Sequence, residues 1–95
     1  MMMHIGAETF DLEITDGITL KDKRQVLRSL LDRARFRFRV AAAEIDHLDS
    51  PQWATIAVVT VSNEQVHANQ VLEAVAQLVE SEPRVIVLER KVEFI

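Results

Sequence analysis

The stretch that decides the fold is TIAVVTV, residues 55–61. It is apolar on both faces and rich in β-branched residues, which is typical of a central strand or of a strand covered on both sides. The next four residues, Ser62 to Gln65, have the S-x-x-Q form of a capping box, in which side chains satisfy free amide groups at a helix start. A strand that leads directly into a helix indicates a domain that mixes strands and helices.

The residues after this capping box predict a helix and a last strand. The apolar residues of the helix recur at a helical spacing, so one side is expected to be buried: Ala68, Val71, Leu72, Val75, Leu78 and Val79. Glu82-Pro83 ends the helix, because the residue before a proline avoids helical geometry. Residues 85–94 alternate as a strand, with Ile86, Leu88, Val92 and Phe94 on one face and Glu89, Lys91 and Glu93 on the other.

Three elements are expected before the central strand. Residues 4–14 alternate as a half-buried strand, which the polar run 15–17 ends. A helix over about 20–37 follows, with Thr19 and Asp22 as a second, weaker capping box. Its apolar arc contains Leu20, Val26, Leu27, Leu30, Leu31 and Ala34. Residues 40–45 predict a short strand, and the segment that follows, with Pro51, predicts a loop.

The resulting order, β-α-β-β-α-β, predicts an α+β fold of the ferredoxin-like, split βαβ type in a single domain over residues 1–95. We expect a four-stranded antiparallel sheet in the order 4-1-3-2 with both helices on one face. The other face is then open. It is expected to carry Asp11 and Glu13 beside the acidic side of the last strand, with Val58 or Val59 on the neighbouring strand. This open face is predicted to be acidic at one end and apolar toward the other.

Charge is unevenly distributed along the chain. Residues 21–39 hold eight of the eleven Lys and Arg residues and only two acidic residues, although the whole chain has a formal charge of −4. On a helix, Lys21, Arg24, Arg28 and Arg35 lie along one flank of the apolar arc, and we call these four residues the basic stripe. Such an asymmetry points to an anionic partner. The alternative is a solvated helix flank whose cationic side chains cover the edge of the core.

Several functional classes lack support in the sequence. There is no Cys, no G-x-S-x-G motif and no glycine-rich phosphate loop, so we expect neither an enzyme nor a cofactor site. His4, His47 and His67 lack the spacing of metal ligands, and we expect no metal site. No apolar run approaches the roughly eighteen residues of a membrane span, and no signal peptide is recognisable, so a cytoplasmic protein is expected.

The positions of the aromatic residues indicate which surfaces could bind a partner. RNA binding on the sheet would need exposed aromatic residues on the two central strands, which this sequence does not provide. Trp53 is interpreted either as the end of a small core or as an exposed anchor for a partner. Of the two phenylalanines near the end of the basic segment, Phe38 is expected to point into the core and Phe36 toward solvent.

The segments TLKDKRQVLRSLLDR, FRVAAAEIDHLD and SNEQVHANQVLEAV resemble the YlxP-like proteins, a bacterial family of unknown function. The family pattern S-L-K-E-K-R corresponds to residues 19–24, and the resemblance covers nearly the whole chain. Trp53 follows Gln52, whereas the family's loop Trp precedes a Gln, and Phe94 replaces the family's C-terminal Trp. The resemblance implies a ferredoxin-like fold and a functional association with the ribosome or with RNA.

These observations lead to two functional hypotheses. The first is a non-enzymatic binding protein that docks on structured RNA or a ribosomal particle, with phosphate contacts from Lys21, Lys23, Arg24, Arg28, Arg35 and Arg39. The second is a protein-interaction or structural module that forms a homodimer through the open sheet face and whose basic helix meets an acidic protein.

Overall fold

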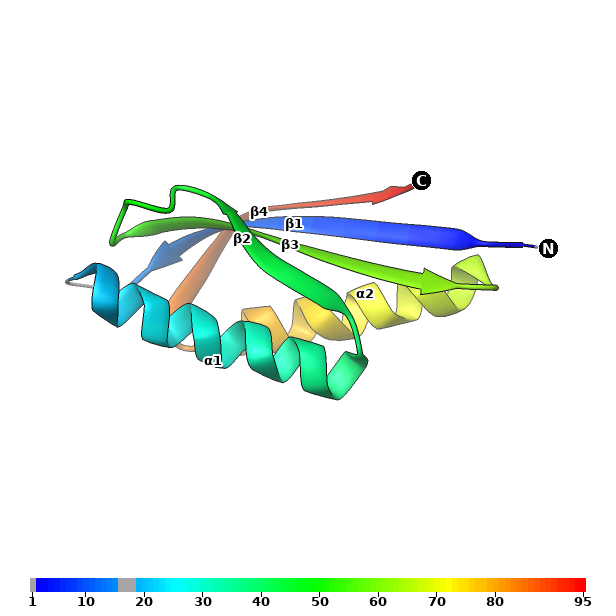
Figure 1. The fold of residues 1–95 in the computed structure, drawn as a ribbon, viewed down its shortest axis with the longest axis horizontal. Helices are drawn as coiled ribbons and strands as arrows, with labels where there is room; N and C mark the ends of the chain where they lie inside the picture. The colour runs from blue at the N-terminus through cyan, green and yellow to red at the C-terminus, as the bar shows by residue number, and fades with distance from the viewer. Residues whose placement is uncertain (1, 16–18) are drawn as a thin grey trace.

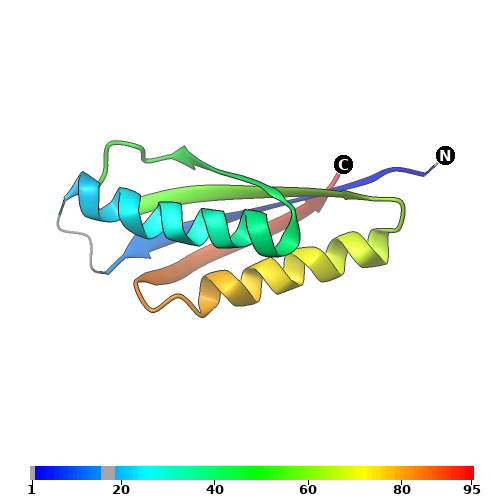
Figure 2. The same cartoon turned by 60° about the horizontal axis from the view of Figure 1, so that its bottom comes forward.

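The chain forms the predicted antiparallel sheet with two helices on one face, as the computed structural model shows for residues 2–15 and 19–95 (Figures 1 and 2). The elements are β1 (His4–Ile14), α1 (Leu20–Phe38), β2 (Ala41–Asp46), β3 (Trp53–Ser62), α2 (Gln65–Glu80) and β4 (Val85–Phe94). The strand order is β2-β3-β1-β4, which is the predicted order read from the other edge. Most of the turn predicted after the first strand lies outside the described residues.

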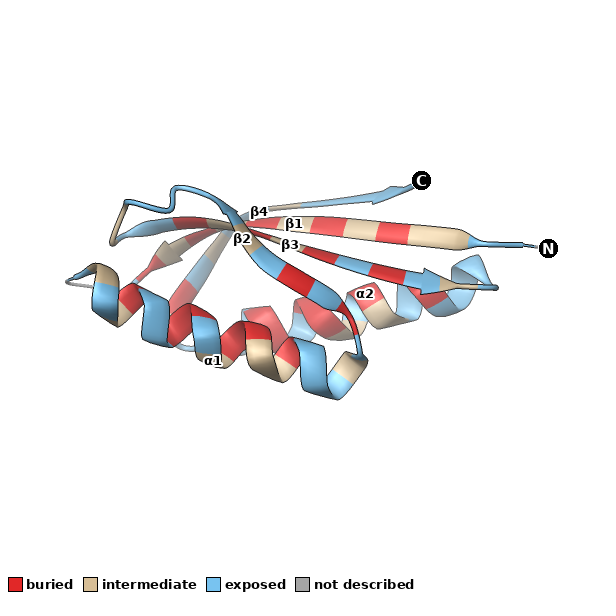
Figure 3. Cartoon of the chain, viewed as in Figure 1, coloured by how far each residue is buried: buried red, intermediate tan, exposed pale blue. Residues whose placement is uncertain are grey.

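The core lies between the sheet and the helices. Alternate residues of β1 and β3 face the helices and are buried, among them Phe10 and Val58, each with an exposed fraction of 0%. Leu30 of α1 and Leu72 of α2 are buried as fully, and Figure 3 shows the buried bands along the strands and helices. Each such side chain contributes about 1.5 to 3 kcal/mol when it leaves water. The two helices are therefore held in place by their apolar sides, which fixes where their polar sides point.

The two predicted capping boxes have different outcomes. At α1 the prediction is confirmed: the Asp22 amide donates to the Thr19 hydroxyl, and the Thr19 amide donates to the Asp22 carboxylate. At α2 the prediction of Ser62 as the cap is wrong, because Ser62 is still paired with His4 in the sheet. The helix begins after Glu64 instead, and the Ser62 hydroxyl accepts a hydrogen bond from the Glu64 amide.

A β-bulge in β4 corrects the predicted faces of that strand. The register with β1 shifts between Asp11 and Leu12, so Leu88 is an extra residue between the pairs Leu12–Val87 and Asp11–Glu89. Because one inserted residue reverses the alternation, Ile86 lies on the open face and not on the side of Val92. The single alternation predicted for residues 85–94 therefore does not hold across Leu88.

The open sheet face has the predicted polarity. At its acidic end Asp11 is paired with Glu89, and Glu13 is paired with the half-exposed Trp53. Its other end is apolar on three neighbouring strands, where it consists mainly of small or β-branched residues: Ala41, Ala43, Ala57, Val59, Val61, Ala7 and Ile5. On β4, the charged Lys91 and Glu93 lie on the same face opposite Thr9 and Ala7. Of Val58 and Val59, the two residues considered for the open face, Val59 is the exposed one.

Neither described helix is long and apolar enough to cross a membrane.

Candidate nucleic-acid interface

Three residues of the basic stripe form an exposed cationic surface on α1. Lys21, Arg24 and Arg28 project from one side of the helix and, with Gln25, surround a shallow depression. Their direction follows from the opposite side of α1, where residues such as Leu27 and Leu30 are buried against the sheet. None of the three cations makes an ion pair with the part of the chain that the structure describes. Their charges are therefore available to an external anion.

Lys23 does not belong to this surface, and the prediction that it contacts phosphate is wrong. Its side chain has an exposed fraction of 1%, and its Nζ lies 2.8 Å from Glu44 Oε2. The same ammonium donates to the backbone carbonyl oxygens of His47 at 2.7 Å and Trp53 at 2.8 Å. The ammonium thus makes two hydrogen bonds to carbonyl oxygens and an ion pair with Glu44. Lys23 therefore ties the start of α1 to the β2–β3 connection.

The C-terminal end of the stripe is partly occupied. Arg35 has a side chain exposed by 45%, and it donates to Asp32 Oδ1 at 3.1 Å and to the Ala42 carbonyl oxygen. Arg39 follows the helix in the left-handed conformation, with φ of 54°, and its amide caps the helix on the Arg35 carbonyl. Its side chain is exposed and makes no ion pair with the described residues. Arg35 is thus shared between the fold and the surface.

On the other side of α1, Arg33 belongs to an ion-pair cluster that holds this helix to the loop before β4. Arg33 donates to the buried Glu82 carboxylate at 2.5 Å, and Arg84 donates to the same carboxylate at 2.8 and 2.9 Å. The hydrogen bonds from Arg84 lower the pKa of Glu82 to about 2, although burial acts in the opposite direction. Sequence reasoning treated Glu82 only as a helix end and did not anticipate this cluster.

A second buried carboxylate lies between the sheet and α2. Glu8 of β1 has an exposed fraction of 1% and accepts from Arg90 of β4 at 3.1 Å, and Arg90 also pairs with Glu73 of α2 at 2.9 Å. Burial raises the pKa of Glu8 to about 7, and the bond from Arg90 offsets part of that effect. Glu8 Oε1 makes no hydrogen bond with the described residues. The alternation of β1 placed Glu8 on the buried side, and this was the one available signal.

The aromatic residues lie as follows. Phe36 is 86% exposed, and Phe38 packs against the core, as predicted. Trp53 lies on the open sheet face, where it shares a depression with Leu88 and Asp11. It therefore does not close the end of the core between the sheet and the helices.

Among residues 2–15 and 19–95, no cluster of three His, Asp or Glu side chains could hold a metal ion.

The fold places the chain among ferredoxin-like proteins. It is similar to a designed protein with a ferredoxin fold, with a TM-score of 0.52, 10% identity, and coverage of 98% of this chain and 86% of the other. It is also similar to a dimeric ferredoxin-like protein of unknown function from Thermobifida fusca, with a TM-score of 0.52, 15% identity, and coverage of 99% and 91%. At these identities the similarity concerns the fold alone.

Within this class, the chain belongs to the family described as protein of unknown function, DUF503, whose model matches residues 5–92. A relative is the uncharacterized protein YlxP of Bacillus subtilis, which is 31% identical over 81 residues, covering 85% of this chain and 88% of the relative. The resemblance to the YlxP-like family is thus confirmed.

Proposed function

We propose that the protein is a non-enzymatic, cytoplasmic binding protein that docks on structured RNA or a ribosomal particle through the basic stripe on α1. The observation that carries this proposal is the group of three exposed cations, Lys21, Arg24 and Arg28, without ion pairs to the described residues. Arg35 and Arg39 extend the surface at its C-terminal end. From Lys21 to Arg35 the stripe spans about 21 Å along the helix, given a rise of about 1.5 Å per residue.

The sorting of cations on α1 supports this function over a merely solvated helix flank. Lys23 and Arg33, which the fold uses, are paired with Glu44 and Glu82 on other elements. Lys21, Arg24 and Arg28 of the stripe have no comparable role in the fold, and helices that are only solvated commonly gain from mixed signs at i,i+4 spacing. Three neighbouring unpaired cations raise the local positive potential, and an anionic polymer lowers the free energy of that surface.

Replacing Arg24 and Arg28 by Gln should weaken RNA or ribosome binding. Each of the four stripe cations neutralises about one phosphate, so the logarithm of affinity of the wild-type protein should fall with the logarithm of salt concentration at a slope of roughly −3. After the double substitution two contacts remain, and the slope should be roughly −1.5. Sequences of different composition should be affected about equally, because phosphate contacts do not read bases. Filter binding at several salt concentrations measures the slopes.

The matched control is Arg37→Gln, which removes an exposed cation from the same helix away from the stripe. Co-sedimentation with ribosomal subunits, with and without ribonuclease, tests the class of partner. If the double variant sediments with the particles as the wild type does, or if ribonuclease leaves the association intact, docking on RNA through the stripe is excluded. An association that survives ribonuclease would indicate that the basic helix binds a protein.

A second candidate function follows from the open sheet face. A protein-interaction module would form a homodimer through this face and present its basic helix to an acidic protein. The favouring observation is that Val59 and Val61 are exposed by 39% and 63% among small residues. An apolar sheet face is more stable when a second sheet covers it.

Val59→Glu should then abolish self-association, because it buries an unpaired charge in the centre of that contact. Analytical ultracentrifugation of the wild type and the variant measures the change. A wild-type protein that remains monomeric at high micromolar concentration contradicts this candidate.

A further inference from the structure

Strand β4 forms one edge of the sheet and has a free outer side. Among the residues that the structure describes, it pairs in the sheet with β1 alone. The Ile95 amide donates to the Ile5 carbonyl oxygen at 2.8 Å, so at this end of β4 the odd-numbered residues direct their backbone groups toward β1. The backbone N–H and C=O groups of Arg90, Val92 and Phe94 consequently point outward. Such a row of unpaired groups is a template for another strand.

Charges on β4 favour one register among those centred on residues 90–93, if two copies of this strand pair. In a two-fold antiparallel contact each residue faces a residue whose number is fixed by the centre of symmetry. A centre at Arg90, Lys91 or Glu93 places that residue opposite its own copy, so like charges face each other. A centre at Val92 places Val92 opposite Val92 and pairs Lys91 with Glu93 on both sides of it.

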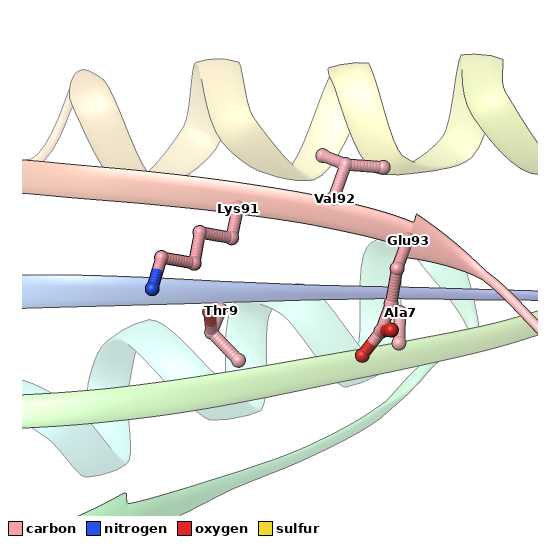
Figure 4. A pocket seen from close by; sticks show the side chains of 5 residues that line it. All are labelled: Ala7, Thr9, Lys91, Val92 and Glu93. Carbon is pink, nitrogen blue, oxygen red and sulfur yellow. The ribbon is translucent and has the colours of Figure 1, made fainter.

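The side chains around Val92 fit this register. Lys91 and Glu93 project to the same face, and Val92 projects to the opposite face, toward α2 (Figure 4). On that helix side, Val92, Phe94 and Val66 are exposed by 39%, 37% and 68% near the free edge. Phe94 and Val66 line a common depression between α2 and the end of β4. The edge therefore offers an apolar strip on one face and a complementary charge pair on the other.

We propose that two copies of the chain associate through β4, edge to edge, in the register centred on Val92, so that one antiparallel sheet continues through both. The contact is isologous, as a two-fold interface requires. It uses the outward backbone groups of the edge and the two Lys91–Glu93 pairs, and it leaves the basic stripe and the open sheet face uncovered. This interface differs from a homodimer that forms through the open face.

Charge reversal tests the register. Lys91→Glu and Glu93→Lys should each weaken dimerisation by roughly tenfold, because each turns two attractive cross-strand pairs into two repulsive ones. The double variant, with both reversals, should recover most of the wild-type dimerisation constant. Glu80→Lys is the matched control, since Glu80 is an exposed carboxylate at the end of α2 and does not lie on β4. Sedimentation equilibrium measures all four variants, with circular dichroism to confirm that each is folded.

Two further measurements separate the edge from the open face. Amide exchange at Arg90, Val92 and Phe94 should slow as protein concentration rises, and Val59→Glu should leave dimerisation unchanged. The proposal is overturned by a monomeric wild-type protein, by a double variant no better than the single ones, or by dimerisation that depends on Val59 and leaves these amides unprotected. None of these readouts depends on RNA binding, so the proposed docking function is tested independently.

Discussion

Lys23 is the residue whose role in the structure differs most from the role predicted for it. A cation in the first turn of a basic helix suggested a surface contact, yet the structure uses it to join α1 to Glu44 and to two carbonyl oxygens of the following connection. Its helical phase, on the same side as Val26 and Leu27, was the available signal. The partners could not be inferred, because they lie 21 to 30 residues away and their positions depend on the tertiary fold.

Lys23→Met should lower the free energy of unfolding by about 3 kcal/mol, because it leaves the Glu44 carboxylate largely buried without its partner. Arg24→Met, a neighbouring exposed cation without an ion pair to the described residues, should change stability by less than about 0.5 kcal/mol. Urea denaturation of both variants measures the difference. Equal stabilities would show that the buried ammonium contributes no more than a surface charge.

Glu8 predicts a dependence of stability on pH. Its pKa is about 7 in the folded protein against 4.5 for an unperturbed carboxyl. A raised pKa means that the folded state holds the proton more tightly, so the stabilising effect is complete below about pH 4.5 and is lost as pH rises through 7. The shift corresponds to about 3 kcal/mol.

Glu8→Gln removes this titration. Relative to the wild type, the variant should therefore gain stability as pH rises from about 5 to about 8, with thermal or urea unfolding at each pH as the measurement. The comparison with the wild type cancels the contribution of Glu82, whose lowered pKa acts only at more acidic pH. A difference between the two proteins that stays constant over this range would contradict the burial of an ionisable Glu8.

At the scale of elements, periodicity predicted the helices and strands well, and their ends less well. The apolar arc of α1 predicted both the helix and the direction of its basic stripe, because a buried side determines where the exposed side points. The start of α2 was misplaced because sheet pairing holds Ser62 in an extended conformation. The bulge at Leu88 was missed because the sequence IVLERKVEF also fits an uninterrupted strand.

At the scale of the whole molecule, the order of elements was sufficient to predict the topology, since few arrangements connect β-α-β-β-α-β without crossings. The three buried ion-pair clusters, around Lys23, Glu8 and Glu82, could not be predicted in the same way. Each joins side chains from different elements, and the sequence records only that such residues exist. The candidate interface was therefore predicted in outline, and the structure decided which cations it contains.

The separation of charge between α1 and the acidic end of the open sheet face gives the molecule an electric dipole. Near a polyanion, this dipole exerts a torque that turns α1 toward the phosphates and turns the acidic end away before contact is made. A larger share of encounters then occurs in the productive orientation. The association rate constant should therefore exceed that of an uncharged protein of the same shape, most strongly at low ionic strength. The same torque leaves the open sheet face directed into solvent, so the docked protein would meet its next partner with that face first.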